Sequence, residues 1–245
     1  MSPASDAVNH GSTLSLPTPT RSSAQFAGWF TAASGGTQVT NSTQWKSSQT
    51  IYAHWKLPYS LTNLVKNPSF EGSTNWSNLT DTTPVTGVKR SGSYSMRFGQ
   101  ATTNGIHTMS TQTFGTPILN HKYYGRIYWY STTAAKISMR YEVFLGDAQG
   151  ANLLLFTYGG NVPANTWTAF SGIKSITTST YLNQTWTIRN FTYSTSTYGT
   201  YVYADDAMII DLTAAFGAGN EPDVSWCDSN IPYFASTQTV YKVPS

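Results

Sequence analysis

Apolar and polar residues alternate in short runs along most of the chain, and this pattern predicts β-strands. Turn residues separate the runs from about residue 64 onward. Many short strands joined by turns are typical of a β-sandwich, so the pattern predicts an all-β protein. The clearest runs are Tyr94–Phe98, Tyr123–Tyr130, Ile137–Leu145, Asn152–Tyr158, Trp186–Tyr193 and Tyr201–Ile210.

One stretch departs from this alternation. Residues 211–234 read DLTAAFGAGNEPDVSWCDSNIPYF, where Ala, Leu and Phe recur at helical spacing. Gly217 and Gly219 suit the positive φ that ends one helical turn, and Pro222 suits the first turn of the next. We therefore expect two short helices here.

The second of these helices is expected to begin with a cap from Asn220 or Glu221. The apolar side chains of both helices are then expected to cover the open end of the sandwich. These side chains belong to Leu212, Phe216, Trp226 and Ile231. The stretch is therefore predicted to be a lid with no chemistry of its own.

The chain divides near residue 60. Before it, shorter β runs at Leu14–Leu16, Phe26–Phe30 and Thr50–Trp55 alternate with Pro and Gly-Gly turns. We expect a small β-rich module over residues 1–57 and a sandwich domain over 62–235 with its helical lid at 211–234. Residues 236–245 are expected to form a strand or an extended arm.

Composition narrows the class of protein. The 245 residues have room for one large or two modest domains, with 10% charged and 14% aromatic residues. This balance suits surface-type sandwiches and glycan-binding surfaces. The net charge of +3 is unclustered, which argues against nucleic-acid binding. The single cysteine, Cys227, excludes an internal disulfide and is expected to be a buried structural thiol.

Export and membrane signals are not evident in the sequence. No apolar run approaches the roughly 20 residues that a transmembrane helix needs. The start, MSPASDAVNHG, has neither a basic segment nor an apolar core, so no secretory signal is expected. A surface-like composition is thus combined with no visible signal for secretion.

The first module carries a family resemblance. FAGWFTAASGGTQVTNSTQWKSSQTIYAHWK, residues 26–56, closely resembles the Listeria–Bacteroides repeat, a small β-rich module of bacterial surface and phage proteins. Members of that family usually begin with a further strand, and this chain starts after it. Trp29, His54 and Trp55 are expected to pack in the small domain.

The second domain resembles a jelly-roll carbohydrate-binding module of the kind attached to cellulases and xylanases. The similarity rests on NLVKNPSFEG with Trp76, on RSGSYSMRF, on NTWTAFSG and on VYADDAMII. The resemblance implies a structural calcium ion, which hard oxygen ligands hold. It places Glu71 and Asp205 as ligands, with the Ser93 carbonyl nearby. The alternative is that these carboxylates cap turns without a metal.

Strand alternation assigns the faces of the predicted sheets. Ile127 and Trp129 share one face, so Arg126, Tyr128 and Tyr130 lie on the other. In the strand Ile137–Leu145, alternation places Arg140 and Glu142 on the face opposite to the apolar side chains. In the strand Trp186–Tyr193, it places Arg189 on the face opposite to Trp186 and Ile188. The candidate carbohydrate- or partner-binding residues are therefore Arg126, Tyr128, Tyr130, Arg140, Glu142 and Arg189.

Three uses of this mixed face remain open. Tyr rings can stack on sugar rings while Arg and Glu bond to hydroxyl groups. Tyr and Arg are also enriched at protein interfaces, so a partner protein is an alternative. The third is an ordinary solvated face.

Catalysis has little support in the sequence. His10, His54, His107 and His121 lack a neighbouring Ser–Asp or Cys pattern. Asp205 and Asp206 are adjacent, so strand alternation is expected to direct them to opposite faces. We therefore predict a protein that is not an enzyme.

The helical ending is closely similar to one found after the sandwich in virion and tail-associated proteins of phages from Gram-positive hosts. The matching residues are Asp211–Thr213, Phe216–Pro222 and Trp226–Cys227. The resemblance implies a virion surface protein, made in the host cytoplasm and acting outside the cell. This would explain a surface-like composition without a secretory signal.

The favoured function is adhesion by glycan binding from a tail or head fibre. The alternatives are a capsid-decoration or connector protein that binds only other virion proteins, and a bacterial cell-wall adhesin. Residues 1–57 are expected to attach to other virion proteins or to a second copy. A strand supplied by another chain would cover the edge left by the missing opening strand.

Overall fold

The computed structural model describes residues 6–77, 82–98, 106–113, 116–145, 153–177, 179, 186–193 and 201–244. Side chains are described throughout these ranges except in most of the strands of one sheet. The chain forms two compact units: Met1–Tyr59 with Thr239–Ser245, and Ser60–Gln238. No described helix is long and apolar enough to cross a membrane.

The first unit is built on an antiparallel sheet whose strand order is β13-β3-β1-β2. Its strands are β1 (Gln25–Phe30), β2 (Gln38–Val39), β3 (Tyr52–Thr62) and β13 (Thr237–Lys242). The β1–β3 register shifts between Phe26 and Gly28, where Gly28 has a φ of 135°. Residues with a Cβ rarely adopt this φ, so the bulge favours glycine; a Cβ at Gly28 would also displace the side-chain Nε2 of Gln38, which lies 2.7 Å from its position.

Aromatic side chains pack on both faces of this small sheet. The Phe26 ring centroid lies 5.7 Å from that of Trp29 and 5.6 Å from that of Trp55. The His54 ring stacks on Phe30 at 4.1 Å, and its Nε2 lies 2.9 Å from the Ala32 carbonyl oxygen. Trp29, His54 and Trp55 therefore pack within the small unit, as the sequence predicted.

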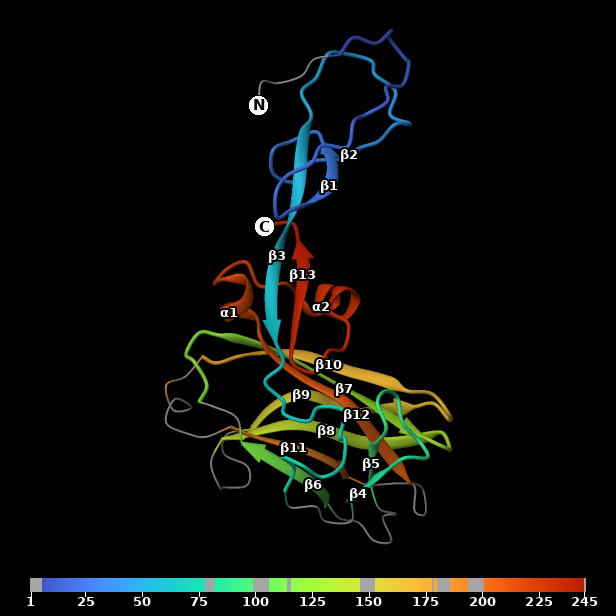
Figure 1. Cartoon of the computed structure of the whole chain (residues 1–245), viewed down its shortest axis with the longest axis vertical. Helices are drawn as coiled ribbons and strands as arrows, with labels where there is room; N and C mark the ends of the chain where they lie inside the picture. The colour runs from blue at the N-terminus through green and yellow to red at the C-terminus, as the bar shows by residue number, and fades with distance from the viewer. Residues whose placement is uncertain are drawn as a thin grey trace. The chain divides into compact units, whose positions relative to one another are not determined.

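The strand that lies beside β3 comes from the same chain. Figure 1 shows β13 next to β3, which also pairs with β1. The 237–242 segment thus pairs with β3 from within the same chain, and a further strand supplied by another chain stays a prediction. Val240 of β13 is 6% exposed, which anchors the segment as a strand rather than as a free arm.

The second unit contains two antiparallel sheets, with strand orders β10-β7-β12-β5-β4 and β6-β11-β8-β9 (Figure 1). The predicted all-β sandwich class is thus confirmed. The first sheet consists of β4 (Thr82–Val85), β5 (Ser95–Phe98), β7 (Lys122–Ser131), β10 (Thr168–Ser175) and β12 (Val202–Asp211). The second consists of β6 (Ile106–Thr113), β8 (Ala135–Leu145), β9 (Leu153–Val162) and β11 (Trp186–Tyr193).

The core of this unit lies on one face of the five-stranded sheet. Ile127 and Trp129 of β7, with Met96 and Phe98 of β5, are fully buried in a single apolar cluster. Alternation along β7 therefore directs its even-numbered residues to the outer face, as the sequence predicted.

Two short helices follow β12. They are α1 (Leu212–Phe216) and α2 (Val224–Asn230), in the region where helices were predicted. Gly217 and Gly219 have φ of 84° and 83°, as expected for the break between them. The expected caps were wrong: Asp223 accepts a hydrogen bond from the Trp226 amide at 2.7 Å. Asp223 is the N-cap because it directly precedes Val224, the first residue of α2.

The α2 segment covers part of the outer face of the five-stranded sheet. The Asp228 carboxylate accepts hydrogen bonds from the Tyr124 hydroxyl at 2.6 Å and the Ser171 hydroxyl at 2.9 Å. Arg126 donates to the Ile231 carbonyl at 2.7 Å. The lid therefore packs on β7 and β10, and not over an open end of the sandwich as expected, because polar side chains of the sheet bind it.

Cys227 lies on the inner side of the lid. It is a free, fully buried cysteine, as the sequence predicted. Burial raises the pKa of its thiol to about 12, so the thiol is not ionised near neutral pH.

Candidate aromatic binding surface

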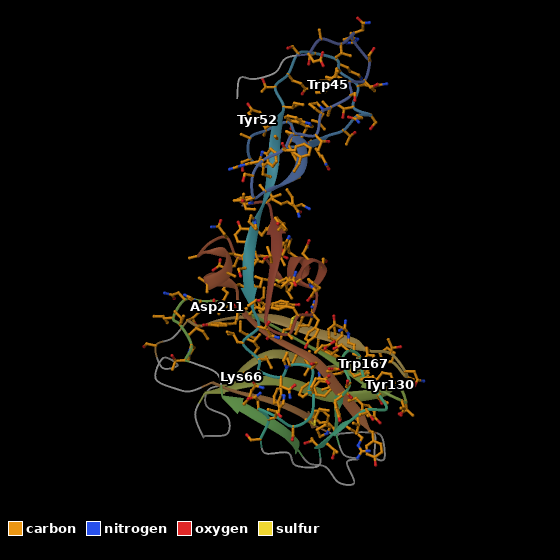
Figure 2. All side chains as sticks on the ribbon, in the orientation of Figure 1. Trp45, Tyr52, Lys66, Tyr130, Trp167 and Asp211 are labelled. Carbon is orange, nitrogen blue, oxygen red and sulfur yellow. The ribbon has the colours of Figure 1, made fainter. Side chains whose placement is uncertain are left out.

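Aromatic rings gather on the part of the outer face that the lid leaves open. Tyr130 of β7 lies at the centre, and its ring centroid is 5.2 Å from that of Trp167 and 5.9 Å from that of Tyr203. Figure 2 labels Tyr130 and Trp167 close together at one end of this unit. Three elements thus contribute one ring each: β7, β12 and the residue before β10.

Sheet register explains why these residues meet. Tyr203 pairs directly with Tyr130, and Thr168 pairs with Trp129, which places Trp167 beside Tyr130. Residues opposite each other on neighbouring strands share a face, and their side chains contact.

Arg97 of β5 extends the row by one strand. It pairs in register with Tyr203, and its guanidinium carbon lies 4.5 Å from the centroid of the Tyr201 ring. We call Arg97, Tyr130, Trp167, Tyr201 and Tyr203 the aromatic surface. Tyr203 is 8% exposed, and the other four side chains are half-buried.

The polar atoms of the surface are held in place. The Tyr130 hydroxyl donates a hydrogen bond to Asn165 Oδ1 at 2.9 Å, which fixes the ring that both neighbours contact. Burial raises the pKa of the Tyr203 hydroxyl, and the Arg97 charge opposes that rise. The Tyr203 hydroxyl is therefore neutral at physiological pH.

The other predicted residues of β7 lie between the aromatic surface and the lid. Arg126 is 3% exposed beneath α2, so its expected exposure is wrong. Tyr128 is half-buried, with the Arg90 guanidinium 3.6 Å and that of Arg126 5.5 Å from its ring centroid. Of the three residues predicted on β7, Tyr130 is the one that belongs to the aromatic surface.

Arg140, Glu142 and Arg189 belong to the other sheet. The register pairs Arg189 of β11 with Glu142 of β8 and Phe191 with Arg140. Their side chains lie outside the described residues. The six predicted binding residues are thus divided between two sheets and do not form one surface.

Asp205 and Asp206 contact the same loop. Asp205 Oδ2 accepts hydrogen bonds from the amides of Arg90 at 2.8 Å and Ser91 at 3.2 Å. Asp206 binds the Arg90 guanidinium and the Ser91 hydroxyl. The expectation of opposite faces is wrong, because Asp206 has a φ of 53° and β12 changes register after Asp205.

These two carboxyl groups are fully buried. Burial, together with the neighbouring charge of Asp206, raises the pKa of Asp205 to about 7. Arg90 supplies one positive charge against two carboxylates, so the pair needs a further proton or cation to be neutral.

Glu71 holds the same loop from its other end. Its carboxylate accepts hydrogen bonds from the Ser93 amide at 2.9 and 3.1 Å and from the Tyr94 amide at 3.3 Å. Gly92 passes so close that an added Cβ would lie 1.9 Å from Glu71 Oε1. The loop from residue 90 to 94 is therefore held by two carboxylates that are far apart in sequence.

The predicted calcium ligands Glu71 and Asp205 thus meet at one loop, but N–H donors face them. The described residues contain no group of three or more His, Cys, Asp or Glu placed to hold a metal ion. In this arrangement the donor set fits capping of a turn, and a calcium ion would have to displace those donors. Calcium stays a prediction.

A separate hollow of about 450 Å³ opens beside α1. Asp211 lines it, accepting from the Ala214 amide at 2.9 Å and lying 2.7 Å from His121 Nδ1 (Figure 2). Asp211 therefore fixes the start of α1 and the loop before β7.

Residues 2–54 match the Listeria–Bacteroides repeat domain. The match confirms the resemblance read from the sequence of the first module. The Listeria–Bacteroides repeat domain ends before the second unit begins, so the aromatic surface lies outside it. No curated protein matches the chain by sequence.

Several solved structures are similar to the second unit. TmCBM61 in complex with beta-1,4-galactotriose is 16% identical over 61% of this chain and 98% of that chain, with a TM-score of 0.44. The CBM22-2 xylan-binding domain from Paenibacillus barcinonensis is 10% identical over 59% and 97%, with a TM-score of 0.44. Tailspike protein 4 of Bacteriophage CBA120 is 21% identical over 60% and 21%, with a TM-score of 0.42.

The ligand of this chain has to be argued from its own residues, because these TM-scores are below 0.5. Sequence reasoning found Tyr130 but missed Trp167, Tyr203 and Arg97 as site residues. The sequence shows that Tyr201 and Tyr203 are two residues apart and so lie on the same face of a strand. It does not show the register that places Tyr203 beside Tyr130.

Proposed function

We propose that the second unit is a non-catalytic glycan-binding module and that the aromatic surface is its binding site. The observation that carries the proposal is the row of Trp167, Tyr130 and Tyr203 on the open outer face. A sugar ring has apolar C–H faces and a polar rim. The half-buried rings of Trp167 and Tyr130, with the guanidinium of Arg97 farther along the row, match both properties.

The chemistry of the surface supports binding rather than hydrolysis. Glycosidases act with two carboxyl groups placed on either side of the scissile bond. The residues of the aromatic surface are aromatic or cationic. The nearest described carboxyl pair, Asp205 and Asp206, is fully buried and bound to the 90–91 loop.

We propose further that the protein is an adhesin on the surface of a phage particle. The repeat domain over residues 2–54 and the resemblance of the 211–234 ending support this proposal. The protein would be made in the host cytoplasm and would act outside the cell. Mass spectrometry and immuno-gold microscopy of purified particles test the location; absence from every particle protein band would contradict it.

A partner protein is the second candidate ligand for the aromatic surface. Tyr, Trp and Arg are the residue types that dominate binding energy at protein interfaces. On this alternative the chain would be a decoration or connector protein of the particle.

A glycan array separates the two candidates. We expect the chain to bind at least one glycan class, and Trp167→Ala to weaken that binding about tenfold, which corresponds to about 1.4 kcal/mol. Tyr52→Ala is the matched control, because Tyr52 is 40% exposed in the first unit. Binding that is unchanged in Trp167→Ala, or binding to no glycan, would contradict the proposal and leave the partner-protein alternative.

A further inference from the structure

We infer that the aromatic surface prefers acidic glycans, which carry carboxylate or sulfate groups, over neutral ones. This inference rests on the proposed function of the surface. It follows from the half-buried guanidinium of Arg97 and from the burial of Asp205 and Asp206.

Arg97 is the cationic member of the surface, and among the described residues no hydrogen bond or ion pair uses the edge of its guanidinium. Its guanidinium lies over the Tyr201 ring at 4.5 Å. A guanidinium that stacks through its face keeps its N–H donors at its edge, in a geometry that matches a carboxylate or sulfate. Of the acidic side chains in the described ranges, none forms an ion pair with Arg97.

The carboxyl groups next to the aromatic surface are buried and not exposed on it. Asp205 and Asp206 follow Tyr203 on the same strand, β12, yet both are fully buried and bound to the 90–91 loop. The direct register neighbours of Arg97 are Tyr203 and Thr83, which are uncharged. An acidic ligand would therefore meet the Arg97 cation with no carboxylate directly beside it in the register.

The row is long enough for an oligosaccharide. Trp167 adjoins β10 and Arg97 lies on β5, three positions away in the sheet order β10-β7-β12-β5. Neighbouring strands lie about 4.8 Å apart, so the row spans about 14 Å. One sugar can stack on Trp167 and Tyr130 while an acidic group farther along the same chain reaches Arg97.

Matched pairs of polymers test this inference with the whole chain. Polygalacturonate is compared with its fully methyl-esterified form, and dextran sulfate with dextran, by affinity electrophoresis and calorimetry. We expect one acidic polymer to bind at least tenfold more tightly than its neutral counterpart. We also expect the preference to shrink with rising salt, because a charge contact is screened.

Arg97→Gln should remove the preference, so that the acidic polymer and its neutral counterpart bind with similar affinity. Lys66→Gln is the matched control, because Lys66 is exposed and lies outside the aromatic surface. Arg97→Lys, which keeps the charge, should retain part of the preference and shows that a loss in Arg97→Gln is not a loss of folding.

The outcomes separate the inference from the proposed function. Tighter binding to neutral polymers, or an acidic preference that Arg97→Gln leaves unchanged, would overturn the inference while the surface remained a glycan site. Binding to none of these polymers, nor to any glycan of the array, would overturn both.

Discussion

Asp205 and Asp206 are consecutive residues of one β-strand, and both direct their carboxylates to the Arg90–Ser91 turn. Asp205 accepts hydrogen bonds from the two amides of that turn, and Asp206 binds the Arg90 guanidinium and the Ser91 hydroxyl. The positive φ of Asp206, 53°, makes this possible. The turn therefore depends on two buried acids, of which Asp205 binds its backbone amides and Asp206 binds its side chains.

The first prediction is a loss of stability as pH rises. Burial and Asp206 raise the pKa of Asp205 from 3.8 to about 7 in the folded protein. The folded state then binds this proton more tightly than the unfolded state, so the stabilisation is complete below pH 4 and lost as pH rises through 7. Urea unfolding between pH 4 and 8 should show this fall.

Asp205→Asn provides the comparison, since it cannot titrate. Its overall stability can be lower, but the fall between pH 4 and 7 should be smaller than in the wild type. Equal slopes in both proteins would show that Asp205 titrates normally.

The second prediction concerns calcium. If Glu71 and Asp205 share a calcium ion, the added ion should raise the melting temperature, and a chelator should lower it. The rise should be larger at pH 8 than at pH 5, because protonation of Asp205 competes with the metal. Asp205→Ala should abolish the response; a wild-type melting curve indifferent to both additions would rule calcium out.

The third prediction concerns Gly92. It has a φ of 56°, and a Cβ there would lie 1.9 Å from Glu71 Oε1. Gly92→Ala should therefore destabilise the unit by about 1–3 kcal/mol, through backbone strain and displacement of the Glu71 carboxylate. Gly87→Ala is the control, because a Cβ at Gly87 meets nothing within 4 Å. Equal denaturation midpoints for the two variants would contradict the role of Glu71 in holding the loop.

The fourth prediction concerns the lid. Arg126→Met keeps much of the side-chain volume but removes the hydrogen bond to the Ile231 carbonyl, which should cost about 1–3 kcal/mol. Amide exchange in residues 224–231 should then be faster than in the wild type. Arg21→Met, at an exposed position of the first unit, should leave that exchange unchanged. If exchange in 224–231 is unaffected by Arg126→Met, the lid is held by other contacts.

Most strands could be predicted from the sequence because alternation is a local property. The run Trp186–Tyr193 coincides with β11, and Tyr123–Tyr130 differs from β7 by one residue at each end. The bend at Asp206 could not be predicted, because a positive φ in a residue other than glycine depends on the turn that its side chain binds.

The aromatic surface was only partly predictable for a similar reason. Tyr130 was found from the parity of its own strand. Its contacts with Trp167 and Tyr203 depend on sheet register, and the burial of Arg126 depends on where α2 packs. Sheet register and helix packing are tertiary relationships, and alternation within one strand does not predict them.

The pairing of β3 with β13 has a consequence for synthesis on the ribosome. β3 is translated before almost all of the second unit, and β13 is translated after almost all of it. The second unit can fold while β3 still lacks one neighbour, and the sheet of the first unit closes last, through a contact of very long sequence separation. A premature stop would leave β3 with an open edge, so ribosome-stalled or truncated chains should be recognised by chaperones through the first unit, while full-length chains escape them.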